Sequence, residues 1–416
     1  MKLLHITASY KPAYVYGGPI YSVTALCEAF SVEYSSVPLR TPNVSSELNT
    51  SVDVITTLAN GKEELPYTSG EKREVEGVAV RYFQRITKDH SHFSPALLWW
   101  LWKNGKAYDV IHIHSWWNLI SMGSVLVCLL KGIKPVVSPR GMLGDYTFTK
   151  GKKLFHQLIG RRLLRRCDFH ATTRMEAEEI RMSFDFAQEN CKIIDLTNGG
   201  VESGEREVEK RKEEREKNKD KKLPSIFVIH NMVKLPEVLP VKTRVFDGIL
   251  KLIFLSRIHH KKGIELLMDA LAKVPFAFSL SIVGEGESDY VESLKWKAER
   301  LGLAKHIEWL GPVYEEEKYK LLAEHDLFVL PSFNENFANV VVESLAVKTP
   351  VLISDKVGLC HYVQKNGLGL VHSNDVDSLT NTLTAFYNQP ILVKDITKDF
   401  SPLHLRKQYL EMYHAQ

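Results

Sequence analysis

A strand, a loop and a helix between residues 327 and 347 constrain the fold more than any other stretch of the chain. The apolar run Leu327–Leu330 stops at Pro331-Ser332, which is typical of a strand that ends at a breaker. A helix is expected from about Asn339 to Val347. The first turn of such a helix has backbone N–H groups without helical partners and the positive end of the helix dipole. The loop before it is therefore a candidate seat for phosphate oxygens.

Two glutamates flank this seat. Glu335 lies in the loop, and Glu343, eight positions later, lies inside the expected helix. One carboxylate on either side of a diphosphate can accept hydrogen bonds from the hydroxyl groups of a sugar and of a ribose. The arrangement suits a nucleotide-sugar, although an isolated pair of this kind is more often two surface or capping acids.

A second strand, loop and helix begin at Leu250. The apolar run from Lys251 to Leu255 leads into SRIHHKKG, and a helix is expected from Ile264. Arg257 and Lys262 flank the turn, so both are expected to reach one diphosphate at the helix N-terminus. A planar guanidinium and a mobile ammonium together neutralise a phosphate that leaves with negative charge. The alternative is a pair of solvated cations.

The string PSFNENFANVVVESLAVKTPV, residues 331 to 351, resembles the signature of the retaining glycosyltransferases of family four, PS-x-x-E-x-F-G-x-x-x-x-E-A-x-A-x-G-x-P-V. The paired glutamates of that family fall on Glu335 and Glu343, whereas Ala338 and Lys348 stand where it has glycine. The loop after Leu255 is similar to its G-R-x-x-x-x-K-G segment, with Ser256 in place of the glycine. The resemblance covers residues 250 to 372 closely and most of residues 1 to 200 loosely.

The resemblance implies an α/β chain with the GT-B fold, in which two Rossmann-like doubly wound domains face a central cleft. The chain, with 416 residues, is long enough for two or three domains. We expect an acceptor domain over 1–200, a charged linker or insertion over 201–249, and a nucleotide-sugar donor domain over 250–401. Residues 223–248 match the family poorly and are either an insertion or a misplaced strand. A last helix at about 402–416 is expected to cross back to the first domain.

In the second half, the resemblance implies that Arg257 and Lys262 hold the donor diphosphate, with Glu335 on the sugar and Glu343 on the ribose. Further donor contacts are expected from Gly284, in the Gly284-Glu285-Gly286 loop, and from the backbone N–H groups of the turn before the helix, Phe337, Ala338 and Asn339.

In the first half, Gly17-Gly18 separates a strand from a helix, which permits close backbone approach to a ligand. A tight turn is the alternative, whereas the resemblance implies contact with the donor, with Gly18 the better candidate. The run Tyr108–His114 is expected to be a buried parallel strand whose carboxyl end presents His114. The resemblance implies that His114 lies beside the donor sugar. Arg140, at another strand exit, suits either an acceptor anion or a surface salt bridge.

The activity that the resemblance implies is transfer of a sugar from a UDP or GDP donor to a glycan or a polyprenyl-linked acceptor. Anomeric configuration would be retained, and bacterial surface polysaccharide biosynthesis is the expected setting. The catalytic residues would be His114, Arg257, Lys262 and Glu335, without a further cofactor. Two alternatives remain: an inactive scaffold that binds nucleotide-sugars, and a nucleotide-sugar epimerase on the same fold.

Metal and nucleic-acid functions are not expected. Asp375-Val376-Asp377 has the DxD form of a metal–diphosphate motif, but it precedes a helix and is explained by capping. The net charge of +4 is too small to indicate nucleic-acid binding. The five scattered cysteines favour reduced thiols, and the first residues contain no long apolar run of a signal peptide. These features point to the cytoplasm.

Residues 150–167, KGKKLFHQLIGRRLLRRC, predict a basic amphipathic helix. It is either a packed helix with a solvated cationic face or a peripheral contact with an anionic membrane at the inner face. For the aromatic helix 94–102 we favour core packing of Trp99, Trp100 and Trp102 over an interfacial anchor. The almost wholly charged stretch 205–222 predicts a solvent-exposed helix or linker.

Overall fold

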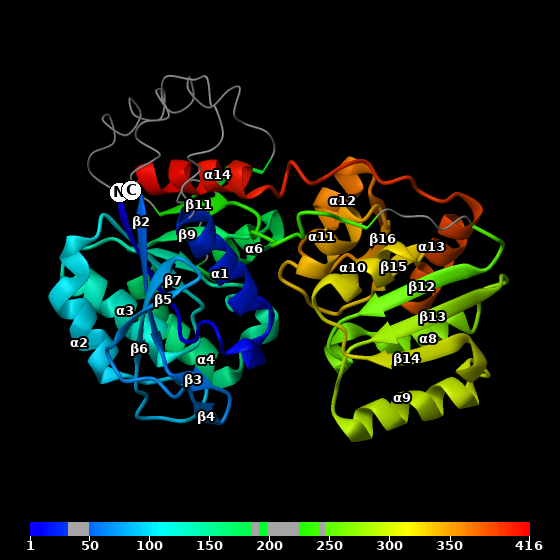
Figure 1. The fold of residues 1–416 in the computed structure, drawn as a ribbon, viewed down its shortest axis with the longest axis horizontal. Helices are drawn as coiled ribbons and strands as arrows, with labels where there is room; N and C mark the ends of the chain where they lie inside the picture. Colours follow the sequence, from blue (N-terminus) through cyan, green and yellow to red (C-terminus); the bar gives the residue numbers. More distant parts are fainter. Residues whose placement is uncertain (32–49, 185–190, 198–223, 241–245) are drawn as a thin grey trace, which may run out of the picture. The chain divides into compact units, whose positions relative to one another are not determined.

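The chain forms two compact units in a computed structural model that describes residues 1–31, 50–184, 191–197, 224–240 and 246–416 (Figure 1). Unit 1 comprises Met1–Met232 and Ser401–Gln416, and unit 2 comprises Val233–Phe400. The charged stretch 205–222 lies outside the described residues.

Within the described residues, the main sheet of unit 1 has the strand order β10-β11-β9-β8-β7-β1-β2-β6-β5. Neighbouring strands are parallel except for β5, which runs antiparallel to β6. The strands are β1 Lys2–Ile6, β2 Ser51–Thr57, β5 Lys72–Val75, β6 Val78–Phe83, β7 Val110–His114, β8 Val136–Ser138, β9 Asp168–Ala171, β10 Lys192–Asp195 and β11 Ser225–Val228, with the hairpin β3 Ala59–Asn60 and β4 Glu63–Glu64 apart from them.

Helices cover both faces of this sheet because successive strand residues point to opposite sides. Leu3 of β1 belongs to a core with residues of α1 and α14, whereas the adjacent Leu4 belongs to a core with residues of α2, α3, α5 and α6. The helical segments are η1 Tyr14–Tyr16, α1 Gly18–Ser31, α2 Pro95–Asn104, η3 Gly105–Ala107, α3 Leu119–Leu130, η4 Asp145–Thr147, α4 Lys150–Phe155, the π-helical η5 His156–Gly160, α5 Arg161–Leu164, α6 Arg174–Ser183 and α14 Pro402–His414.

The last helix, α14, is part of unit 1 although unit 2 precedes it in the sequence. Ser401 accepts a hydrogen bond from the backbone N–H of His404, and Pro402 occupies the first turn, where its missing N–H costs nothing. The Gln408 side chain donates to the Leu196 carbonyl at 2.7 Å, and Tyr409 and Tyr413 are buried against the sheet. Polar side chains as well as apolar packing therefore fix α14 on unit 1.

Unit 2 contains a parallel sheet with the order β14-β13-β12-β15-β16-β17 in the described part of the chain. The chain runs outward from β12 to β14, returns beside β12 as β15, and then runs outward the other way. This is the doubly wound order, and its topological switch point lies between β12 and β15, where ligands bind in such folds. The elements are β12 Leu250–Leu255, η7 His260–Lys262, α8 Ile264–Leu271, β13 Phe278–Val283, α9 Ser288–Arg300, η8 Ala304–His306, β14 Ile307–Gly311, α10 Glu315–Ala323, β15 Leu327–Leu330, α11 Asn339–Ala346, β16 Val351–Ser354, α12 Cys360–Asn366, β17 Gly369–His372 and α13 Val376–Asn388.

The predicted α/β class with two Rossmann-like halves is confirmed, and β15 and α11 lie where the sequence places them. Of the two alternatives for residues 223–248, an insertion or a strand, the strand is present as β11. The antiparallel β5 and the hairpin strands β3 and β4 were not predicted. Core packing of the tryptophans is wrong for Trp99 and Trp102, whose exposed fractions are 59% and 37%.

None of the helices in the described ranges combines the length and the apolar character needed to span a bilayer.

Removal of one hydroxyl tests how α14 is held. Tyr413→Phe leaves the buried His112 Nδ1, 2.8 Å from the tyrosine hydroxyl, without its donor. We expect the free energy of unfolding to fall by about 1–3 kcal/mol in urea titrations, because a buried acceptor loses its partner. The control is Tyr314→Phe at a 64% exposed position, which is expected to change stability by less than about 0.5 kcal/mol. Equal stability of Tyr413→Phe and wild type would contradict this account.

Candidate active site

The loops after β12 and β15 pack directly on one another at the switch point of unit 2. Gly263 adopts φ +70°, and a Cβ there would lie 2.1 Å from the Pro331 carbonyl oxygen. The Phe333 backbone N–H donates to the Lys261 carbonyl at 2.9 Å. The contact leaves no room for a side chain at residue 263, so this glycine fixes the distance between the two loops.

Lys262 and Glu335, one from each loop, form an ion pair in which Lys262 Nζ donates to Glu335 Oε2. The two side chains retain 11% and 23% of their accessible surface, so ligand atoms can reach them. Burial lowers the pKa of the adjacent Lys261, the Glu335 carboxylate raises it, and the positive charges of Lys262 and Arg257 lower it further. Three cationic side chains therefore act on one another around a single carboxylate.

Arg257 is exposed at the start of the β12 loop, and the described residues give it neither an ion pair nor a side-chain hydrogen bond. A guanidinium in that state is available to an anion. The structure thus brings together three of the predicted residues, Arg257, Lys262 and Glu335, at the carboxyl ends of the strands that flank the switch point. Lys261, which was not predicted from the sequence, joins them because it lies in the tight turn of η7.

Helix α11 begins at the predicted place, and Ala338 has the left-handed conformation, φ 68° and ψ 80°, immediately before it. No side chain in the described part of the chain caps this helix end. Lys348, after the helix, also has a positive φ of 65°. These are the two positions at which the family signature has glycine. The backbone therefore keeps a conformation that glycine adopts freely and that alanine and lysine adopt with strain.

Glu343 lies on α11 with its Oε1 2.7 Å from Lys318 Nζ of α10. The Glu343 side chain is 12% exposed, so a charged partner offsets most of the cost of its burial. Lys318 was missed because it lies 25 positions upstream in an ordinary charged helix, and no local spacing marks it.

Gly284 occupies the loop after β13 with φ +140°, and a Cβ there would lie 1.9 Å from the Ser256 carbonyl oxygen. Its N–H donates to Gly311 at 2.8 Å. Gly286 likewise packs on Ile258, with which it forms an isolated parallel bridge. These two glycines let the loop after β13 pack closely on the Arg257 loop, a structural requirement in addition to the predicted role of Gly284 in donor binding.

In unit 1, the predicted residues gather at that unit's own switch point, between β1 and β7. Gly17 ends η1 with φ 68°, and Gly18 is the first residue of α1. A Cβ on either glycine would have no heavy atom within 4 Å, so the backbone there is open to close approach. His114 is the last residue of β7 and is fully buried.

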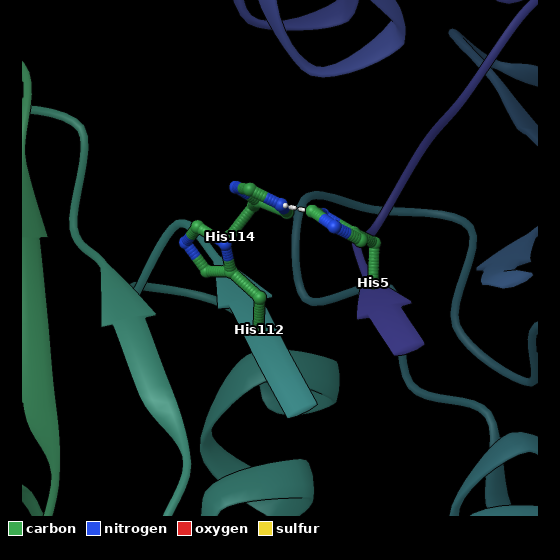
Figure 2. A group of neighbouring side chains, drawn as sticks. All are labelled: His5, His112 and His114. Atoms are coloured by element: carbon green, nitrogen blue, oxygen red, sulfur yellow. Dashed lines mark hydrogen bonds between the residues drawn. The ribbon is translucent and has the colours of Figure 1, made fainter. Parts of the chain in front are cut away.

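Three histidines meet at the end of these strands (Figure 2). His5 of β1 pairs in register with His112 of β7, and His5 Nδ1 lies 2.9 Å from His114 Nε2. Burial and the nearby Arg140 lower the pKa of His5 to about 3, and burial also holds the pKa values of His112 and His114 well below 6.5. All three rings are therefore neutral at pH 7.

The hydrogen bonds determine where each ring carries its proton. Arg140 donates from a guanidinium nitrogen to His114 Nδ1 at 3.2 Å, so His114 carries its proton on Nε2 and donates it to His5 Nδ1. His5 then carries its own proton on Nε2, for which the described residues supply no acceptor. Arg140 also donates to Ser22 Oγ at 2.9 Å and to Asn231 Oδ1 at 3.1 Å. It is a partly buried residue that orients its neighbours, and the described residues form no surface salt bridge with it.

A second chain of hydrogen bonds runs from α14 across the sheet. The Ile229 carbonyl can only accept, so His170 donates to it from Nε2 at 2.9 Å and accepts from Ser138 on Nδ1 at 2.7 Å. Ser138 Oγ then accepts from His112 Nε2 at 2.6 Å, and His112 Nδ1 accepts from Tyr413. Each ring nitrogen of His112 and His170 in this chain either donates or accepts, and Ser138 Oγ does both, so the hydrogen bonds all run in one direction from Tyr413 to Ile229.

The three-histidine cluster does not suit a metal ion, although its ring nitrogens lie within 4.8 Å of one another. Both nitrogens of His112 and both of His114 are engaged in hydrogen bonds, and the Arg140 guanidinium adds positive charge beside them. Asp375 Oδ1 accepts from the Ser378 N–H at 2.7 Å at the start of α13, which confirms the capping interpretation of the DxD string.

The strained helix start can be tested by restoring glycine. We expect Ala338→Gly to raise the free energy of unfolding by about 1 kcal/mol, because the left-handed conformation costs alanine more than glycine loses in chain entropy. Urea titration of the variant measures it. The matched control is Ala385→Gly at an exposed position inside α13, expected to lose about 1 kcal/mol. Destabilisation by both changes would contradict strain at Ala338.

The neutral histidines predict loss of stability in acid. Because the pKa of folded His5 is about 3 and its ordinary value is 6.5, the unfolded chain binds the proton first. Stability is therefore complete above pH 6.5 and falls as the pH drops toward 3. Each such histidine contributes a slope of up to about 1.4 kcal/mol per pH unit. Unfolding titrations at several pH values should show a shallower dependence for His5→Gln and an unchanged one for the exposed His306→Gln; equal slopes would contradict the assignment.

With this geometry in place, comparison with known proteins identifies two matching family models. Residues 45–195 match the glycosyl transferase 4-like domain, and residues 238–399 match the glycosyl transferases group 1. An uncharacterized glycosyltransferase of Methanocaldococcus jannaschii is 23% identical over 275 residues, 65% of this chain. The phosphatidyl-myo-inositol mannosyltransferase of Mycobacterium leprae is 32% identical over 146 residues, 34% of this chain. The matched regions span 64% and 38% of those two relatives.

Solved structures support the fold over the whole length. Anabaena HepE in complex with UDP and glucose matches with a TM-score of 0.64 at 16% identity, and both chains are covered completely. The lipopolysaccharide outer core galactosyltransferase WaaB in its apo form matches with a TM-score of 0.62 at 15% identity, over 100% of this chain and 99% of that one. The two doubly wound units and the two family models lead to one conclusion: the chain belongs to the group 1 glycosyltransferases and has the GT-B fold.

Proposed function

We propose that the chain transfers a sugar from a nucleotide-diphosphate donor to a glycan or polyprenyl-linked acceptor, with retention of anomeric configuration. The observation that carries the proposal is the meeting of Arg257, Lys262 and Glu335 beside the start of α11 at the switch point of unit 2. The nucleotide-sugar is a substrate, and we expect no further cofactor.

The donor diphosphate is assigned to the cations of the β12 loop. Arg257 is exposed and offers a planar pair of N–H donors, while Lys262 is held by Glu335 and offers a point charge. The backbone N–H groups of Phe337, Ala338 and Asn339 supply further donors at the positive end of α11. UDP and GDP donors both fit this chemistry, and the similar Anabaena HepE forms a complex with UDP and glucose.

The hydroxyl groups of the donor are assigned to three side chains. Glu335 has one oxygen on Lys262 and a second for a sugar hydroxyl, and Glu343 has Oε1 on Lys318 and Oε2 for the ribose. We assign His114 Nε2–H to another sugar hydroxyl, which would replace His5 Nδ1 as its acceptor.

The chemical step follows from these roles. The bond between the anomeric carbon and the phosphate oxygen breaks as the acceptor oxygen bonds to the same face of the sugar. The departing phosphate oxygen takes the acceptor proton. Arg257 and Lys262 stabilise the charge that develops on the phosphate, a contribution that often dominates catalysis. Glu335 and Glu343 are not a glycosidase pair, because such acids flank the scissile bond itself.

Names of the relatives support a surface glycan as the acceptor. One is an O-antigen biosynthesis glycosyltransferase of Escherichia coli, and another is a putative teichuronic acid biosynthesis glycosyltransferase of Bacillus subtilis. We therefore propose an acceptor at the inner face of a membrane, reached from the cytoplasm.

Two substitutions test the assignment. A thermal-shift screen of nucleotide-sugars identifies the donor. With that donor, we expect Lys262→Ala and Glu335→Ala to lower the transfer rate by at least about 100-fold, because each removes a charged side chain that contacts the reacting diphosphate or sugar. The product measured by NMR should retain the anomeric configuration of the donor. Lys305→Ala, at an exposed lysine of unit 2, is the control and should keep the wild-type rate.

The same assay separates the alternatives. Wild-type turnover in either variant would refute the site. Donor binding without any release of nucleoside diphosphate would indicate a scaffold, and an isomerised sugar without an acceptor would indicate an epimerase.

A further inference from the structure

The segment from α4 to α5 exposes apolar side chains that a packed helix would bury. Leu154, Leu158 and Ile159 are exposed by 58%, 61% and 48%. Leu154 and Leu158 are four residues apart, so they lie on one side of the helix. The packed-helix interpretation of this segment is therefore incomplete, because part of its apolar side faces outward.

The chain segment that carries these apolar residues is positively charged and contains no acid. Residues 146–166 contain no aspartate or glutamate. Lys150, Lys153, Arg162 and Arg166 are exposed, and the described residues form no ion pair with them. Within the described residues no ion pair offsets the charge of these four side chains, so it is available to an external anionic surface.

The segment is also anchored. Arg161 and Arg165 donate to the carbonyls of Ser183 and Phe184 at the end of α6, each at 3.2 Å. Lys152 lies 5.3 Å from the centre of the Trp117 ring. These bonds hold the helix in place while its outer side stays uncovered, so the surface is preformed.

The neighbouring helices continue this surface. α3 packs against both α2 and α5, and all three cover the same face of the sheet in unit 1. α2 exposes Trp99 and Trp102, and α3 exposes Leu126 and Leu130. Neither helix contains an acidic residue. Lys103 lies 4.9 Å from the Trp99 ring and Lys131 4.7 Å from the Trp102 ring, which places a cation beside each exposed aromatic ring.

We infer that this surface, formed by α2, α3 and the α4–α5 segment, docks on an anionic lipid bilayer. Aliphatic side chains enter the acyl boundary, tryptophans prefer the headgroup zone, and lysine and arginine bind lipid phosphates. The absence of acids over three helices suits a uniformly negative partner better than a protein surface of mixed charge. Docking rests on the geometry of unit 1; its purpose, bringing the enzyme to a lipid-linked acceptor, rests on the proposed function.

The test is flotation of the full chain with vesicles of phosphatidylcholine alone and of phosphatidylcholine with phosphatidylglycerol. Wild type is expected to float with the anionic vesicles and to stay behind with the neutral ones. Leu154→Ser with Leu158→Ser and Ile159→Ser should lower binding at least about tenfold, and so should glutamine at Lys150, Lys153, Arg162 and Arg166. Equal flotation with both vesicle types would overturn the inference.

Matched controls lie in unit 2. Leu392→Ser removes a 96% exposed leucine and is the control for the leucine variants. Trp296→Ser removes a 75% exposed tryptophan and is the control for Trp99→Ser, which should lower binding to the anionic vesicles. Glutamine at Arg300, Lys305, Lys365 and Lys398 removes the same amount of charge from exposed positions. These controls should float as wild type does, and a loss equal to that of the surface variants would contradict a local site. Hydrolysis of a soluble donor without vesicles should be unchanged in the surface variants, so failure of docking and failure of the proposed activity are distinguishable.

Discussion

The close packing of three strand-end loops in unit 2 is the constraint on which the rest of its site depends. Gly263 and Gly284 allow the Arg257 loop to lie against the Pro331 carbonyl on one side and to present its own Ser256 carbonyl to the neighbouring loop on the other. Any larger residue at either glycine would push the loops apart. Because the loops pack this closely, Lys262 from one loop and Glu335 from another meet in an ion pair. For the proposed function this packing provides preorganisation, because the charges are in place before a donor phosphate binds.

In unit 1, five rings that carry polar atoms are buried between the sheet and α14. His5, His112, His170, Tyr409 and Tyr413 are buried, and neutral rings are cheap to bury only if their nitrogens are bonded. The chain of hydrogen bonds that ends at the Ile229 carbonyl meets this requirement for His112 and His170 and ties α14 to the sheet, whereas His5 Nε2 has no partner among the described residues. The guanidinium of Arg140 then selects the tautomer of His114. Acid weakens this unit because protonating a buried ring breaks the chain.

Much of the fold and of the unit 2 site could be predicted from the sequence because their signals are local. The apolar run before Pro331, the glutamates eight apart and the Arg257–Lys262 spacing each lie within one loop and one helix. What was missed depends on distant partners: Lys318 lies beside Glu343, and His5 lies beside His114. Residues 223–248 stayed undecided between an insertion and a strand because the pairing of β11 with β10 is also a long-range contact. The exposure of Trp99 was predicted wrongly because the burial of an aromatic helix depends on which other elements pack over it. The composition of the helix itself does not reveal those elements. The positive φ of Ala338 was not predicted because alanine ordinarily avoids the left-handed conformation.

The central claim is that the β12 loop and the start of α11 recognise a pyrophosphate. Calorimetric titration of the protein with a panel of nucleoside diphosphates and their parent nucleosides tests it most directly. We predict that at least one diphosphate binds at least about tenfold more tightly than its nucleoside, that added salt weakens this preference, and that Arg257→Gln removes most of it. Equal affinity for a nucleoside and its diphosphate, or a diphosphate affinity unchanged in Arg257→Gln, would contradict the claim.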